Sequence, residues 1–63
     1  MQMQLNDTPQ LIRTYLGTGE LFEEYYEIDG KKEGIYKSYH DNGKIWQICN
    51  FIDNRLNGEC KLY

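Results

Sequence analysis

The chain repeats itself with a step of 24 residues, and a repeat constrains the fold strongly because every unit must adopt the same local structure. The segments YLGTGELF at 15–22 and YHDNGKIW at 39–46 show the repetition most clearly. Residues 1–9 lie outside it, so we expect a flexible lead-in followed by a repeat domain over 10–63, with units near 15–38 and 39–63. A shift of 24 superposes Tyr15 on Tyr39 and Tyr63, Gly19 on Gly43, Ile28 on Ile52, Asp29 on Asp53, Gly34 on Gly58, and Lys37 on Lys61.

Turn residues separate runs that are typical of strands. The steps Thr18-Gly19 and Asn42-Gly43 predict tight two-residue hairpins, because glycine and asparagine tolerate positive φ. The segments IDGKKEG and IDNRLNG predict longer turns centred after Gly30 and Asn54. The intervening runs are rich in Tyr, Ile, Phe and Trp. The predicted fold is an all-β, single-layer antiparallel meander of about five strands, near residues 10–16, 20–28, 34–40, 44–51 and 58–63.

These turns set the register, in which the numbers of opposite residues add to 37, 61, 85 and 109 in successive strand pairs. A three-residue loop with a glycine bulge would instead shift the partners by one. Both faces mix aromatic and charged residues, which favours a sheet with water on both sides. One face then carries the rungs Tyr15, Phe22, Tyr39, Trp46, Tyr63 and Arg13, Glu24, Lys37, Ile48, Lys61; the other carries Leu16, Leu21, His40, Ile45 and Ile12, Tyr25, Tyr36, Cys49, Cys60.

Length and charge limit the function. A chain of 63 residues is close to the smallest that folds on its own burial, so help from a partner or a second copy is expected. A net charge of −3 gives no long-range attraction to a phosphate backbone, so no nucleic-acid partner is expected. The sequence shows neither a secretory signal nor an apolar run of membrane-spanning length, which predicts a cytoplasmic location.

The side chains that could take part in catalysis or metal binding do not form a catalytic pattern. Cys49 and Cys60 are too few for a disulfide framework, so we expect free thiols, although their opposite positions make a disulfide geometrically allowed. Two thiols are a poor metal site. His40 has no suitably spaced partner, and the neighbours Glu23 and Glu24 face opposite ways on a strand. We therefore expect no catalytic residue, metal or cofactor.

The segments YLGTGELFEEYYEIDGKKEGIYKSY and YHDNGKIWQICNFIDNRLNGECKLY resemble the variant MORN repeat. The resemblance covers residues 11–63 and implies one β-hairpin per repeat, hairpins laid side by side in an elongated twisted sheet, and no catalytic activity. Variant members include bacterial antitoxin or immunity-type proteins and large-DNA-virus proteins, whereas eukaryotic members are linked to scaffolding near membranes, phosphoinositide contact and dimerisation. The chain departs from the pattern in having Asn54 where the first unit has Gly30, and the array is short.

The sequence therefore predicts a non-enzymatic protein-interaction module. An open edge at strand 58–63 predicts self-association into a homo-oligomer. One alternative is an antitoxin or immunity-type inhibitor of a single partner, and another is a binder of anionic lipid headgroups through Lys31, Lys32 and Arg55, which the net charge disfavours. The aromatic contact candidates are Tyr15, Phe22, Tyr39, Trp46 and Tyr63.

Overall fold

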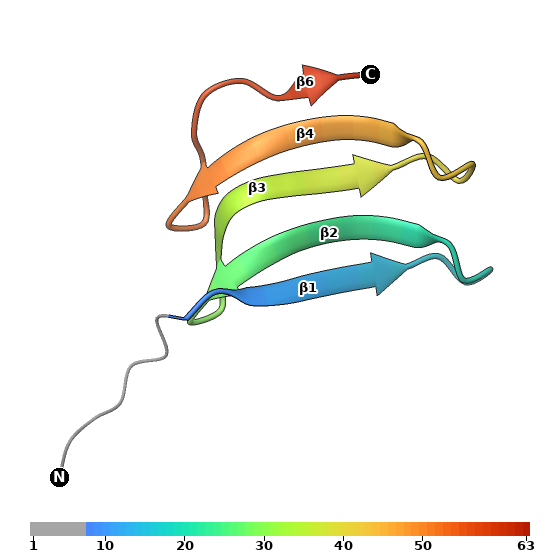
Figure 1. The fold of residues 1–63 in the computed structure, drawn as a ribbon. Helices are drawn as coiled ribbons and strands as arrows, with labels where there is room; N and C mark the ends of the chain where they lie inside the picture. Colours follow the sequence, from blue (N-terminus) through green and yellow to red (C-terminus); the bar gives the residue numbers. More distant parts are fainter. Residues whose placement is uncertain (1–7) are drawn as a thin grey trace, which may run out of the picture.

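From β1 to β5, each strand pairs with the next in one antiparallel sheet, which confirms the all-β meander (Figure 1). The computed structural model describes residues 8–63, so most of the predicted lead-in lies outside the described residues. The sheet order is β1-β2-β3-β4-β5, and β6 also pairs with β4. The strands are β1 (Gln10–Tyr15), β2 (Leu21–Ile28), β3 (Lys31–Tyr39), β4 (Ile45–Ile52), β5 (Arg55–Leu56) and β6 (Lys61–Leu62).

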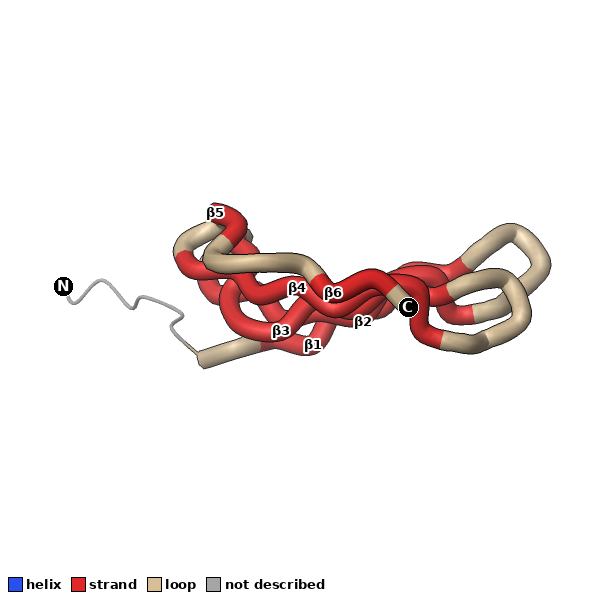
Figure 2. The backbone as a smooth tube through the Cα atoms, turned by 90° about the horizontal axis from the view of Figure 1, so that it is seen from above, coloured by secondary structure: helices blue, strands red, loops and turns tan. Residues whose placement is uncertain are grey.

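The sheet is a single curved layer, as the view in Figure 2 shows, with β5 turned out of the plane of the other strands. The Cα atoms extend only 12 Å in the thinnest direction. Among the described residues only Cys49, at 5% exposure, and Ser38, at 1%, are buried. Within residues 8–63 no second layer covers either face, so this part of the chain is held together by contacts between neighbouring strands.

The central register is the predicted one. Arg13 pairs with Glu24, Glu24 with Lys37, and Lys37 with Ile48, and Ile48 then pairs with Lys61 of β6. The neighbouring rung, on the other face, joins Ile12, Tyr25, Tyr36 and Cys49. Because this register recurs in each strand pair, one type of rung is extended from β1 to β6.

The prediction assigned the two kinds of turn to the wrong segments. The two-residue turns lie in IDGKKEG and IDNRLNG, where longer turns were predicted. Asp29 and Gly30 have φ of 53° and 79°, and the pair Ile28–Lys31 closes the hairpin around them. Positive φ at both central residues defines the type I′ turn, which Asp-Gly favours because it matches the strand twist. Residues 33–35 of β3 form a β-bulge opposite Tyr26 of β2, and this bulge restores the predicted register in the rest of β3.

The Thr-Gly and Asn-Gly steps belong to three-residue loops and not to the predicted two-residue hairpins. Leu16 N donates to Glu20 O at 2.8 Å and Gly19 N donates to Leu16 O at 2.8 Å; His40, Gly43 and Lys44 repeat these bonds. This is the arrangement in which glycine in the left-handed region follows a type I turn. The partners shift by one, as the bulged alternative predicts.

The shift changes the pairing at this end of the sheet. Leu21 lies opposite Tyr15 and Ile45 lies opposite Tyr39, where the predicted register had Leu16 and His40. Phe22 and Trp46 become the extra residues of two bulges. The predicted aromatic rung is therefore interrupted by bulges in both β2 and β4.

The backbone conformation recurs with the same step of 24. The positive-φ residues in the described chain form four pairs at that spacing: Gly19 and Gly43, Asp29 and Asp53, Gly30 and Asn54, Gly34 and Gly58. Asn54, at φ 67°, takes the place of Gly30 without a change of turn, since asparagine tolerates this region better than most residues.

The predicted last strand, 58–63, is shorter in the structure. Arg55 and Leu56 form β5 against the end of β4, and only Lys61 and Leu62 form β6. Gly58, at φ 82°, lies between them at the position that Gly34 occupies in the first unit. The same bulge that leaves β3 continuous therefore divides the last strand in two.

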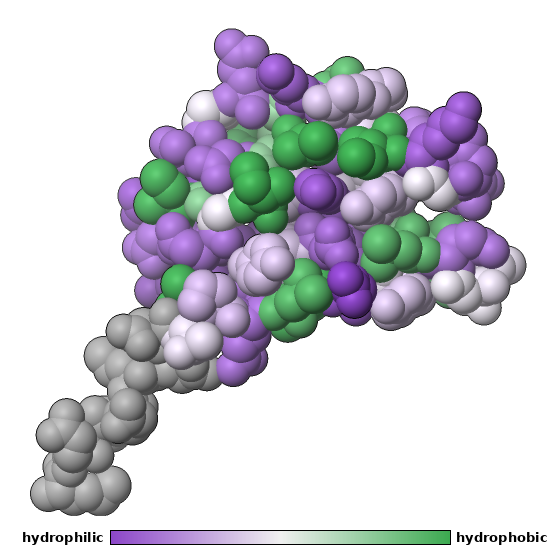
Figure 3. Space-filling view, in the orientation of Figure 1, coloured by the Kyte–Doolittle hydropathy of each residue, from purple (hydrophilic) through white to green (hydrophobic). Residues whose placement is uncertain are grey.

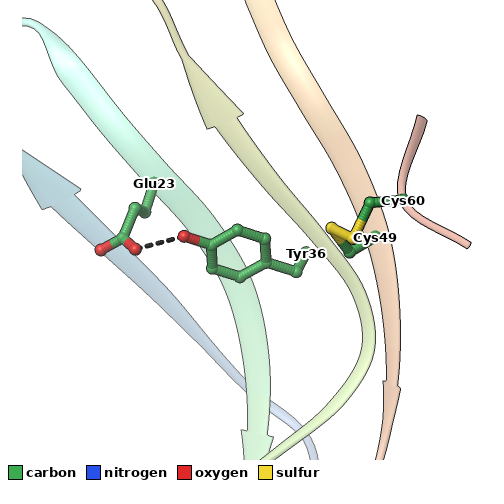
Figure 4. Close-up of a disulfide and its surroundings, with 4 residues drawn as sticks. All are labelled: Glu23, Tyr36, Cys49 and Cys60. Atoms are coloured by element: carbon green, nitrogen blue, oxygen red, sulfur yellow. Dashed lines mark hydrogen bonds between the residues drawn. A yellow bond between two sulfur atoms is a disulfide. The ribbon is translucent and has the colours of Figure 1, made fainter. Parts of the chain in front are cut away.

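The expectation of free thiols is wrong, because Cys49 and Cys60 form a disulfide that joins β4 to the loop before β6 (Figure 4). Their Cα atoms are 4.3 Å apart. This short separation is typical of a non-hydrogen-bonded pair in an antiparallel sheet. The predicted register also places Cys49 opposite Cys60. The expectation rested on the small number of cysteines and on the inferred compartment, whereas the strand pairing itself brings the sulfurs together.

A glycine substitution tests the three-residue loop. Gly43→Ala should lower the free energy of unfolding by about 1–2 kcal/mol, because Gly43 has φ of 86° and an alanine Cβ is strained there. Gly17→Ala is the matched control, since Gly17 also has open space around its Cα but lacks positive φ. Chemical denaturation of both variants measures the difference. Equal effects would contradict the assigned loop.

Candidate interaction surface

The two faces of the sheet differ in what their side chains contact. We call the face that carries Ile12, Tyr25, Tyr36 and Cys49 the tyrosine face, and the face that carries Arg13, Glu24, Lys37 and Ile48 the open face. Paired residues share a face, and alternate residues along a strand face opposite ways. By this alternation, all five of the predicted aromatic contact residues lie on the open face.

The tyrosine face holds a row of packed rings. The rings of Tyr25 and Tyr36 have centroids 5.5 Å apart, and Phe51 meets Tyr36 edge-on at 5.7 Å. Lys32 Nζ lies 5.1 Å from the Tyr25 ring centroid and 5.7 Å from that of Phe51. Aromatic pairs and cations over rings each contribute about 0.5–1.5 kcal/mol, so this row links β2, β3 and β4 where no core does.

A carboxylate fixes the end of this row. Glu23 accepts hydrogen bonds from Thr14 Oγ1, at 2.9 Å, and from Tyr36 Oη (Figure 4). Burial, the hydrogen bond to Glu23 and the negative charge of Glu23 all raise the pKa of Tyr36 above its ordinary value. Burial also raises the pKa of Tyr25, with a smaller effect from Glu27 and Glu23. The tyrosines are thus held protonated.

The open face leaves large aromatic side chains in water. We call Tyr15, Phe22, Tyr39, Trp46 and Tyr63 the aromatic set. Tyr39 is half-buried, whereas the others are exposed by 59% (Tyr15), 37% (Phe22), 42% (Trp46) and 65% (Tyr63). In the described chain no ring of the set packs against another of the set; the nearest ring contact is between Trp46 and His40, with centroids 6.2 Å apart. The predicted stacked rung is therefore an exposed group of separate rings.

A shallow hollow lies beside the aromatic set on the same face. It has a volume of about 290 Å³ and is lined by Glu24, Tyr26, Ile35 and Lys37. Tyr26 and Ile35 are 43% and 46% exposed. Sequence reasoning missed the hollow because it depends on the bulge at 33–35, where a positive-φ glycine was the only signal.

Charged residues border the hollow. Arg13 Nε donates to Glu24 Oε2 at 2.8 Å, and this bond together with the charge of Glu24 raises the pKa of Arg13. Figure 3 shows one face of the molecule, on which hydrophobic residues form separate patches among hydrophilic ones. A surface of this kind can contact a partner with both apolar and charged groups.

The predicted headgroup cations do not form one cluster. Lys31 Nζ lies 3.4 Å from Asp53 Oδ1, Lys32 is directed onto the rings of the tyrosine face, and Arg55 is exposed in β5. The two type I′ turns also contact each other, because Asn54 N donates to Lys32 O at 2.9 Å. The Lys31 side chain and the Lys32 backbone therefore link the two turns, and the three cations do not converge on one headgroup site.

The residues considered for chemistry do not converge. Within residues 8–63 no group of three His, Cys, Asp or Glu side chains could hold a metal ion. His40 is exposed beside Trp46, and both sulfurs are in the disulfide. The described part of the chain also contains no helix of the length and apolarity needed to cross a membrane.

Comparison of the chain with protein-family models, with curated proteins and with solved structures finds no match.

The Tyr36–Glu23 bond makes stability depend on alkaline pH. A raised folded-state pKa gives Tyr36 a stabilising contribution that is full below its unfolded pKa of about 10 and is lost as pH rises through the folded value. Tyr36→Phe should lower the free energy of unfolding by about 1–2 kcal/mol at pH 7 and reduce its fall above pH 10. Chemical denaturation at pH 7 and above pH 10 measures the free energy of unfolding of this variant, with Tyr63→Phe at an exposed position as the control. An unchanged alkaline slope would contradict the assignment.

Proposed function

We propose that this chain is a non-enzymatic protein-interaction module that binds a partner protein, or a second copy of itself, through the open face. The exposure of the aromatic set carries the proposal. Tyr15, Phe22, Trp46 and Tyr63 each leave more than a third of their surface in water on one face of a single-layer sheet. Tyr and Trp supply much of the binding energy at protein interfaces, because they bury a large area and lose few rotamers.

The hollow supports the same surface. Tyr26 and Ile35 offer an apolar floor for a partner's side chain, while Glu24 and Lys37 offer opposite charges at its border. Arg13 neutralises part of the Glu24 charge. A partner would therefore place an apolar side chain in the hollow and cover the aromatic set with a wider apolar area, an arrangement of anchor and surround that is common at interfaces.

We also propose that the chain is built from MORN-type hairpin units. The register and the four pairs of positive-φ positions, both of which step by 24, support this. In such a design each unit adds two strands and a portion of the same binding face, which is how repeat proteins enlarge a surface. The role that this resemblance suggests is binding, including the masking of one partner by an antitoxin or immunity-type protein.

Self-association gives the first test of the open face. At tens of micromolar, we expect sedimentation velocity to show a dimer or larger species for the wild-type chain. The variant Trp46→Ser, Tyr63→Ser should weaken association by about tenfold or more, because it removes two exposed rings from the surface. Leu56→Ser is the matched control, since Leu56 is 56% exposed but lies in β5, away from the aromatic set.

A pull-down from the native host tests a different partner with the same variants. A stoichiometric protein that is retained by the wild type and by Leu56→Ser, but lost with Trp46→Ser, Tyr63→Ser, would identify the open face as its binding site. A monomeric wild type would contradict self-association. Partners retained equally by all three chains would contradict binding through this face.

A further inference from the structure

The last seven residues are held to the sheet by very few contacts besides the disulfide. β6 comprises only Lys61 and Leu62, and Leu62 and Tyr63 are 71% and 65% exposed. Beyond the strand ladders, Asn57 N donates to Asn50 O and Tyr63 N donates to Trp46 O, each at 2.8 Å. We call residues 57–63 the clasp. Its side chains bury little apolar surface, so the Cys49–Cys60 bond is its main attachment.

The clasp covers the edge of an apolar strand. β4 contains Ile45, Trp46, Ile48, Phe51 and Ile52, and its outward backbone oxygens at 46 and 50 accept the two bonds just described. β5 covers only residues 51 and 52 of this edge. Without the clasp, most of β4 would present unpaired N–H and C=O groups beside apolar side chains, which is the kind of edge that pairs with another chain.

The two sulfurs differ in access. Cys49 is 5% exposed, whereas Cys60 is only half-buried and lies in the loop before β6. A small thiolate attacks the sulfur it can reach, and the displaced sulfur leaves as a thiolate. Attack at Cys60 therefore leaves Cys60 joined to the small thiol and frees Cys49 at the uncovered edge of β4.

We propose that the clasp is exchangeable between two copies of this chain. A small thiol opens the intramolecular disulfide at Cys60, and the Cys49 thiolate of a second copy then attacks the mixed disulfide at Cys60. The small thiolate leaves, and an intermolecular Cys49–Cys60 bond forms. When both copies exchange, two intramolecular disulfides become two intermolecular ones, with no net oxidation and with the small thiol regenerated. The result is a dimer in which each copy's clasp lies on the partner's β4.

A second copy is the occupant because it supplies the same complementary segment. The contacts of the clasp from Cys60 onward, including the disulfide and the pairs Gln47–Leu62 and Ile48–Lys61, can be made again between copies. Exchange of identical elements is for this reason an inexpensive route to dimers. Tyr63 belongs to both the clasp and the aromatic set. The exchange, however, transfers backbone pairing and the disulfide at the edge of β4 and requires no binding through the open face, so it is tested independently of the proposed function.

The connection is long enough for the exchange. Four peptide units separate Leu56, the last residue of β5, from Cys60, which must reach the partner's Cys49. Extended, they reach about 14 Å, which is close to three strand spacings. Residues 57–59 are exposed, and Gly58 gives this connection a residue that can change conformation freely. β5 can therefore remain on its own β4 while the clasp crosses to the partner.

Isotope mixing tests the exchange on the wild-type chain. Equal amounts of ¹⁴N and ¹⁵N protein, combined from micromolar to millimolar concentration in a mixture of reduced and oxidised glutathione, are quenched with acid, digested and analysed by mass spectrometry. Intramolecular disulfides give peptide pairs of a single isotope. Exchange gives mixed-isotope Cys49–Cys60 pairs, which should rise with concentration toward half of all such pairs. At low concentration closure within one chain should prevail, because its effective concentration is in the millimolar range.

Two comparisons decide the outcome. Without glutathione, the pairs should remain unmixed at every concentration, because the disulfide cannot open. Mixed-isotope pairs should join Cys49 to Cys60 and rarely join like cysteines, because the β4 register selects the partner. Unmixed pairs at millimolar concentration with glutathione would overturn the proposal. So would a random distribution of Cys49–Cys49, Cys49–Cys60 and Cys60–Cys60 links, which would indicate linkage of unfolded chains.

Discussion

The pairing of each strand with the next is the interaction on which the rest of this structure depends. In a two-layer protein a slip in one strand pair can be resisted by packing against a second layer. Here no second layer covers either face, and only Ser38 and Cys49 are buried in the described chain. The register must therefore be fixed by the turns and by the cross-strand pairs themselves, because a slip by one residue would move every side chain to the other face.

The tyrosine face shows which contacts take the place of a large buried core in the described chain. The ring row over β2, β3 and β4, the hydrogen bonds to Glu23 and the disulfide all act across neighbouring strands. Each contact is modest, but each reinforces the same register. A natural consequence is a division of roles between faces, since the tyrosine face uses its aromatic residues internally and the open face leaves its own available.

Much of the sheet could be predicted from sequence because a repeat requires the register to step by the same 24 residues in every unit. The rung from Arg13 to Lys61 and the rung through Tyr25, Tyr36 and Cys49 follow from that single rule. The turns could not be assigned as well. Both Asn-Gly and Asp-Gly favour a two-residue hairpin, and the sequence does not show which of the two turns contains the bulge.

The errors at the turns and on the open face have the same origin. Once the turns are reassigned, Phe22 and Trp46 become bulge residues, the predicted aromatic stack separates, and the bulge at 33–35 creates the hollow. The disulfide is a different kind of error, because the register already placed Cys49 opposite Cys60, and only the low cysteine count and the inferred compartment argued against a bond. In both cases, local geometry decided what composition could not.

Backbone amide exchange, resolved by residue and measured on dilute protein, tests the single-layer register most directly. The Leu16 N–H points toward the β2 side of the sheet, where it donates to Glu20 O. The N–H groups of alternate residues in β1 point the same way, and the N–H groups between them point to solvent. The account predicts slow exchange at Ile12 and Thr14, fast exchange at Leu11 and Arg13, and slow exchange throughout 36–38 of the central strand β3. Equal protection of all four β1 amides, or fast exchange in β3, would contradict it.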